Sequence, residues 1–235
     1  DAIAKDPMGQ SSITSSDLYP RRLWAYLLER FPPVAYTLLV GLFSGSAFGL
    51  LRHLEGVDVS LSVGCRAAVV VLLVFLHLRI MDEHKDEEGD RAAYPERLLT
   101  RGIVTLPMLA KVGWIAVSLE AAIALTISPA ALGFWACAFV FTLLMKFEFG
   151  VGSWLSKHLV WYAITHNPIV AFLALFLWSV TDARWSPEYG VYVAIVSLGS
   201  LAFELGRKIR LPEEEIAGVE SYSSVLGRAS ADNLF

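Results

Sequence analysis

Long apolar stretches of similar length divide this sequence, and they constrain its fold more than any other feature. A helix needs roughly 20 apolar residues to cross the hydrocarbon core of a membrane. Backbone polar groups cannot stay unpaired in lipid, so apolar stretches of that length are interpreted as helices. The stretches that qualify are residues 33–51, 59–81, 102–127, 130–147, 159–180 and 189–206. We therefore predict an all-α, polytopic membrane helix bundle with about six transmembrane helices.

The remaining residues predict one membrane domain with short polar ends. Residues 1–19 are mostly polar and are expected to form a mobile N-terminal arm. Residues 20–32 place apolar side chains on one side and basic ones on the other, which is typical of a helix lying in the headgroup region. A plain linker is the alternative for this segment. Residues 20–210 form the membrane domain, and 211–235 form a cytoplasmic tail or the start of a truncated C-terminal part.

Lys and Arg alternate along the chain in a way that predicts its orientation. They gather before the first stretch, after the second, after the fourth and after the sixth, whereas the intervening loops offer only Arg52 and Arg184. Cytoplasmic loops of membrane proteins carry the excess of positive charge. Both termini are therefore predicted to be cytoplasmic.

Ionisable residues also fall inside the apolar stretches. Arg66, Lys111 and Glu120 are predicted to face the bundle interior or a cavity, because such groups are costly in lipid. His77 and Arg79 lie closer to the end of the second stretch and are expected to reach the membrane interface. Pro168 predicts a kink in the fifth stretch.

An acidic segment follows the second stretch. If that helix continues, Glu83, Asp86 and Asp90 lie on one face, and Asp82, Asp86 and Asp90 form an alternative stripe. Clustered carboxylates repel one another unless cations neutralise them, and oxygen ligands suit Mg²⁺ shared with phosphates. The alternative is a solvated acidic loop. Arg97 follows within the same loop and is suited to holding anionic oxygens.

A second charged segment follows the sixth stretch, on the same predicted side of the membrane. Arg207, Lys208 and Arg210 are followed by three consecutive glutamates, 213–215. The two charged segments are expected to converge over the mouth of the bundle. A charged rim above an apolar cavity suits a substrate with a phosphorylated head and an apolar tail.

The first charged segment resembles a motif of the UbiA superfamily of intramembrane prenyltransferases. That motif reads Asn-Asp-x-x-Asp-x-x-x-Asp, and the matching residues here are Asp82, Glu83, Asp86 and Asp90. A family stretch of the form Arg-Pro-x-x-x-Gly is matched by Arg97 and Gly102. The family's second motif is Asp-x-x-x-Asp followed by Gly-x-x-Thr, and its positions fall here on Arg210, Glu214, Gly218 and Ser221.

The resemblance implies a Mg²⁺-dependent enzyme that transfers an isoprenyl group from a polyprenyl diphosphate to an acceptor at the cytoplasmic side. It implies metal ligands at Asp82, Glu83, Asp86, Asp90 and Glu214, with Asp86 and Asp90 catalytic. Expected substrate-binding residues are Arg97, Arg101, Arg207, Lys208 and Arg210. The expected partners are this phosphorylated lipid, or another one, and membrane lipids, with no nucleic acid.

The sequence departs from the family pattern at three points. Glu83 replaces the first Asp of the first motif, Arg210 replaces an acid of the second, and six stretches stand where the family has nine spans. We expect Arg207, Lys208 and Arg210 to take the place of one metal site. The alternatives are a UbiA-type terpene cyclase, a CDP-alcohol phosphotransferase, whose motif is poorly matched at 88–93, and a non-catalytic membrane protein such as a transporter.

Overall fold

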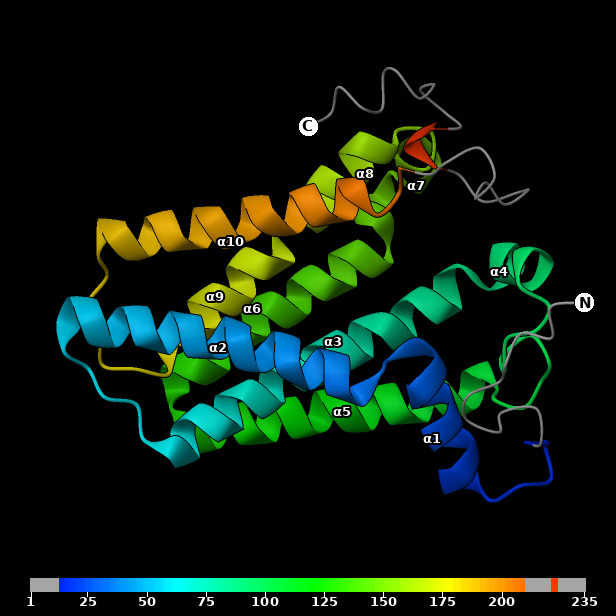
Figure 1. Cartoon of the computed structure of the whole chain (residues 1–235), viewed down its shortest axis with the longest axis horizontal. Coiled ribbons are helices and arrows are strands. Elements are labelled where there is room, and N and C mark those ends of the chain that lie inside the picture. The colour runs from blue at the N-terminus through cyan, green and yellow to red at the C-terminus, as the bar shows by residue number, and fades with distance from the viewer. Residues whose placement is uncertain (1–12, 210–220, 224–235) are drawn as a thin grey trace, which may run out of the picture.

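The protein is a bundle of α-helices, seen here in a computed structural model that describes residues 13–209 and 221–223 (Figure 1). The elements in the described part are α1 (Tyr19–Arg30), α2 (Pro33–Glu55), α3 (Leu61–Lys85), α4 (Glu87–Ala93), α5 (Leu106–Ile127), α6 (Pro129–Lys146), the short 3₁₀ turn η2 (Glu148–Gly150), α7 (Gly152–Leu155), α8 (Leu159–His166), α9 (Ile169–Ser179) and α10 (Pro187–Gly206).

Six candidate membrane spans confirm the prediction from the apolar stretches. They are α2, α3, α5, α6, the α8–α9 pair and α10, and each is long and apolar enough to cross a membrane. Ser60, Ser128 and Ser186 begin α3, α6 and α10, and each hydroxyl accepts a backbone N–H of the first turn. Gly56, with φ of 66°, ends α2 in the left-handed conformation that glycine adopts most easily.

The fifth span is broken where Pro168 predicted a kink. α8 ends at His166 and α9 begins at Ile169. The side-chain amide of Asn167 donates a hydrogen bond of 2.9 Å to the backbone carbonyl of Ser197 on α10. Asn167 thereby fastens the broken span to its neighbour.

The long helices run side by side, and α1 crosses one end of the bundle (Figure 1). We call this the α1 end; it also carries α4 and the ends of α3, α6 and α10. α3 and α5 make the most extensive contact, and Gly113 permits their close approach, since an added Cβ would lie 3.3 Å from Ile80. Gly41, Gly45 and Gly49 form a small-residue stripe on α2 with nothing within 4 Å of an added Cβ.

A buried polar cluster joins the central helices. The His77 ring on α3 lies 2.7 Å from Glu120 of α5 and 3.3 Å from the Thr142 hydroxyl of α6. The Trp135 indole donates to the other Glu120 oxygen at 2.9 Å. Because the Thr142 hydroxyl donates to the Phe139 carbonyl, it accepts from His77. Both ring nitrogens of His77 are thereby engaged in hydrogen bonds.

Two predictions for ionisable residues were wrong. His77 does not reach the interface; it is 1% exposed, because its partner Glu120 lies at the same depth in the bundle. Lys111 is exposed and does not face the interior. The prediction for Glu120 is confirmed, since its side chain is fully buried.

Replacing Glu120 by Leu should lower the free energy of unfolding by about 1–3 kcal/mol, because two buried donors lose their acceptor. Glu120→Gln should cost less, because an amide can accept from Trp135 and donate to His77. Thermal unfolding in detergent, followed by circular dichroism, measures both. Glu55→Leu, at the exposed end of α2, is the matched control. Equal losses in Glu120→Leu and Glu55→Leu would contradict the role of the cluster.

Candidate functional site

The acidic segment does not continue α3 as one helix. α3 ends at Lys85, and Asp86 forms a bend, with φ of −96° and ψ of 5°, before α4 begins at Glu87. The expectation of one unbroken helix face is therefore wrong. The carboxylates form two neighbouring groups, one around Glu83 and Asp90 and one around Asp82 and Asp86.

Glu83 is the centre of the first group, although it lies at the water-facing end of a membrane helix. Its side chain is only 2% exposed. Its Oε1 accepts from Arg30 Nε of α1 at 2.7 Å and from Arg79 Nη2 of α3 at 2.8 Å. A buried carboxylate needs such partners, because an unpaired charge at that depth is costly. We call Arg30, Arg79, Glu83, Asp90 and Arg97 the arginine–carboxylate cluster.

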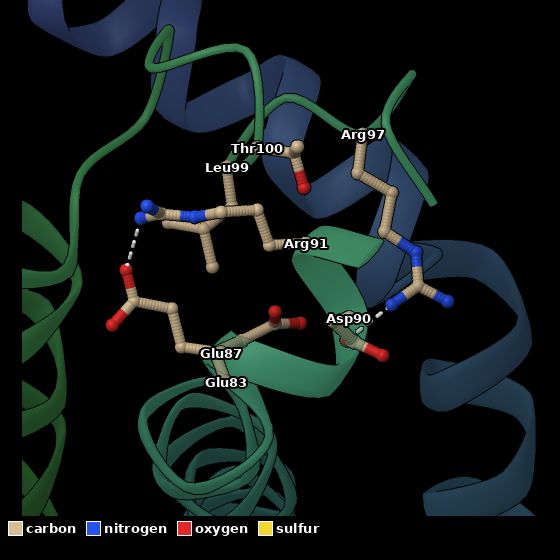
Figure 2. Close-up of a pocket in the computed structure, with 7 residues that line it drawn as sticks. All are labelled: Glu83, Glu87, Asp90, Arg91, Arg97, Leu99 and Thr100. Atoms are coloured by element: carbon tan, nitrogen blue, oxygen red, sulfur yellow. Dashed lines mark hydrogen bonds and ion pairs between the residues drawn. The ribbon is translucent and has the colours of Figure 1, made fainter. Parts of the chain in front are cut away.

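Asp90 closes the same cluster from α4. Arg97 donates to Asp90, as Figure 2 shows, and Arg30 Nη2 lies 3.7 Å from the same oxygen. The Arg97 guanidinium also lies 3.5 Å from the ring centre of Tyr94. The cavity lined by Glu83, Asp90 and Arg97 holds about 10 Å³, which is room for about one water. The ion pairs therefore fill the space around Glu83 and Asp90.

α1 is tied to the loop after α4 by two further polar contacts. Arg22 Nε donates to the Ile103 carbonyl at 2.5 Å, and Glu29 accepts from the Leu98 backbone N–H at 3.3 Å. Desolvation raises the pKa of Glu29, while the Leu98 N–H lowers it. These contacts fix α1 across the end of the bundle, where Arg30 can reach Glu83.

The second group surrounds Tyr162 of α8. Lys85 donates to the Tyr162 hydroxyl, and its Nζ lies 4.6 Å from the ring centre. Lys208, just beyond α10, approaches the same ring at 5.3 Å. The loop after α3 and the end of α10 thus meet at one aromatic side chain. We call Asp82, Lys85, Asp86, Tyr162, Arg207 and Lys208 the Tyr162 cluster.

The carboxylates of the Tyr162 cluster are stabilised in their charged form by cations from both charged segments, the one at the end of α3 and the one after α10. Lys85 and Arg207 act on Asp82, and Lys85 and Lys208 act on Asp86. The Asp86 side chain is partly exposed to solvent. Partial desolvation raises the pKa of its carboxyl; the positive charge of Lys85 lowers this pKa, and the negative charge of Asp90 raises it further. The two charged segments that the sequence placed on one side of the membrane therefore lie together.

The basic residues of α10 already have a carboxylate partner. Arg207 Nη2 lies 2.8 Å from Glu204, and Lys208 Nζ lies 3.3 Å from the same side chain. Glu204 is itself partly exposed, so these pairs are open to exchange with a ligand. Arg101 is exposed and has no ion pair with a described carboxylate. Arg210 and Glu214 lie outside the described residues.

A strained loop borders the Tyr162 cluster and was not anticipated from the sequence. Glu148 and Phe149 have φ of 48° and 54°, a region that costs a non-glycine residue of order 1–3 kcal/mol. Glu148 Oε1 lies 3.5 Å from Lys85 Nζ, and Phe149 packs edge-on against His166. Two closely spaced glycines, Gly150 and Gly152, are the sequence signal that could have revealed this loop, since an added Cβ at Gly152 would overlap the Glu148 side chain.

The residues of the Tyr162 cluster fit a magnesium ion held together with a phosphate group. Mg²⁺ usually takes one or two carboxylates and completes its shell with water and substrate phosphates. Asp82 and Asp86 supply oxygens of this kind. Glu83 and Asp90 are already neutralised by arginine, and the described residues contain no group of three or more Asp, Glu, His or Cys arranged to hold a metal by themselves.

Comparisons of the sequence with protein-family models and with curated proteins, and of the fold with solved structures, found no match.

Arg30→Ala should destabilise the protein by about 2 kcal/mol or more, because Glu83 is left buried with Arg79 as its remaining partner. Arg21→Ala is the matched control on α1, since the Arg21–Asp17 pair is exposed to solvent and contributes little to stability. Thermal unfolding in detergent compares them. Equal stability of the two variants would show that the buried pair does not hold α1 in place.

Proposed function

We propose that this protein is a Mg²⁺-dependent membrane transferase of the UbiA type, which moves an isoprenyl group from a polyprenyl diphosphate to an acceptor. The observation that carries the proposal is the Tyr162 cluster, in which Lys85 and Lys208 approach one aromatic ring and Arg207 and Lys208 lie within electrostatic range of Asp82 and Asp86. The cluster thus combines carboxylates suited to a metal with cations suited to phosphate oxygens. The match of the acidic segment to the first UbiA motif supplies the reaction class.

The chemistry breaks the bond between the first isoprenyl carbon and the diphosphate oxygen. The bonding electrons leave with the diphosphate, the resulting allylic cation is attacked by the acceptor, and the acceptor loses a proton. Mg²⁺, when bound, neutralises the departing oxygens. Arg207 and Lys208 add fixed positive charge at the same place, which stabilises charge that develops in the transition state.

The arginine–carboxylate cluster has a supporting role in this proposal. Arg30 and Arg79 neutralise Glu83, and Arg97 neutralises Asp90. Asp82 and Asp86 are then the carboxylates best placed to hold a metal. Glu83 and Asp90 contribute to catalysis in this arrangement by holding α4 and the loop after it in position, although the family motif assigns both to metal binding.

The basic run after α10 is proposed to replace a second metal ion. Arg207 and Lys208 are now paired with Glu204, and a diphosphate would compete for these pairs. Guanidinium binds phosphate oxygens in a bidentate manner and keeps its charge at every relevant pH. The proposed site is cytoplasmic, because the positive charges of the sequence favour that side.

Asp86→Ala should abolish Mg²⁺-dependent release of diphosphate from an isoprenyl diphosphate without unfolding the protein. A partly exposed carboxylate at a helix end contributes little stability, but the metal would lose a ligand. Glu88→Ala is the matched control, because Glu88 is exposed on α4 and has no ion pair with a described residue. Release of radiolabelled diphosphate, with and without acceptor, measures the effect.

Full activity of Asp86→Ala, or equal losses in Asp86→Ala and Glu88→Ala, would remove the metal role of Asp86. Turnover by the wild-type protein without any acceptor would instead indicate a terpene cyclase, since that reaction needs the isoprenyl diphosphate alone. No turnover with any isoprenyl diphosphate would favour a non-catalytic membrane protein.

A further inference from the structure

A groove opens between α5 and α6 toward the α1 end, and α3 forms its floor. Its volume is about 70 Å³, several times what one water needs. The residues at its rim are Ala110, His84 and Lys146, and those at its inner end are Val117, His77 and Phe139. Each helix contributes two positions seven residues apart, so the groove extends about 10 Å along the helices at 1.5 Å per residue.

The inner end of the groove offers no free polar atom. Both ring nitrogens of His77 are engaged, Nδ1 with Glu120 at 2.7 Å and Nε2 with Thr142 at 3.3 Å. The walls between rim and inner end are apolar and include Ile80 and Leu143. Trp114, which lines one side, is 64% exposed, so the groove is open toward the lipid. This part suits hydrocarbon.

The rim is basic and has no acidic partner among the residues that the structure describes. Lys146 is exposed and forms no ion pair with a described carboxylate; its nearest ring contact is Phe147, at 5.9 Å. His84 bonds the Ile80 carbonyl through Nδ1 at 2.8 Å, which leaves Nε2 directed elsewhere and able to donate when the ring is protonated. A cation without a partner at the mouth of an apolar groove is complementary to an anionic head with a hydrocarbon chain.

We propose that this groove binds an anionic membrane phospholipid. Its phosphate group contacts Lys146 and His84, and the upper part of one acyl chain lies along α3 toward His77. Basic pockets between transmembrane helices bind anionic headgroups in this manner, and each buried methylene adds to the affinity. The inference is independent of the proposed transferase activity, because none of these residues belongs to the Tyr162 cluster.

The lipid would adjoin the candidate site. Met81 and Lys146 line the groove and also a small cavity on the adjacent face of α3, which is bordered by Asp82 and Lys85. The His77–Thr142 contact forms part of the partition between the two spaces. A bound lipid therefore packs against the wall of the Tyr162 cluster.

Native mass spectrometry of the full chain, extracted from vesicles of equal parts phosphatidylglycerol and phosphatidylcholine, tests the proposal. The wild-type protein should retain phosphatidylglycerol severalfold over phosphatidylcholine. Lys146→Gln should lose this preference, whereas Lys157→Gln, an equal charge change at an exposed site outside the groove, should keep it. Equal retention of both lipids by the wild type, or equal effects of the two variants, would overturn the proposal.

Filling the groove gives a second test that leaves the charge unchanged. Leu143→Trp should displace the lipid, whereas Val140→Trp, on the exposed side of α6, should not. If Leu143→Trp fails to fold, a photoreactive benzoylphenylalanine in place of Trp114 should cross-link phosphatidylglycerol in preference to phosphatidylcholine. Retention by a folded Leu143→Trp protein equal to that of Val140→Trp, or indiscriminate cross-linking, would contradict the groove as the binding site.

Discussion

The buried ion pairs of Glu83 are the interaction on which the α1 end of the bundle depends. Arg30 reaches Glu83 from α1, and Arg79 reaches it from one turn earlier on α3. The same Arg30 lies near Asp90, so one guanidinium joins the crossing helix, the end of a span and the start of α4. The bend at Asp86 is thereby held between two fixed segments.

This arrangement separates structural carboxylates from available ones within nine residues. Glu83 pairs with Arg30 and Arg79, and Asp90 pairs with Arg97, the last of these pairs being drawn in Figure 2. The cationic neighbours of Asp82 and Asp86 are instead Lys85, Arg207 and Lys208. Arg207 and Lys208 already form ion pairs with Glu204, and these pairs are exposed or partly exposed. In the proposed function, a lipid diphosphate would bind cations that can exchange their present partner for it, and Arg207 and Lys208, now paired with Glu204, are cations of this kind.

The sequence predicted the helix class, the number of spans and the break at Pro168, because apolar length and proline act locally. It also placed Asp82, Asp86, Arg207 and Lys208 on one side of the membrane. It did not reveal that Arg30 and Arg79 share Glu83, that Tyr162 joins Lys85 to Lys208, or that His77 pairs with Glu120. Apart from Arg79–Glu83, which are one helical turn apart, those contacts join residues distant in the chain, and helix periodicity carries no information on which helices become neighbours.

The central claim is that Asp86 and Lys208 act on one bound anion, and a double-mutant cycle tests it most directly. Isothermal titration of the wild-type protein, Asp86→Asn, Lys208→Gln and the double variant with inorganic diphosphate and Mg²⁺ gives four binding free energies. Residues that share a ligand are coupled by about 0.5 kcal/mol or more. The account predicts that each single change weakens binding and that the double variant departs from their sum by at least that amount. Strictly additive losses, or diphosphate binding unchanged by either substitution, would contradict it.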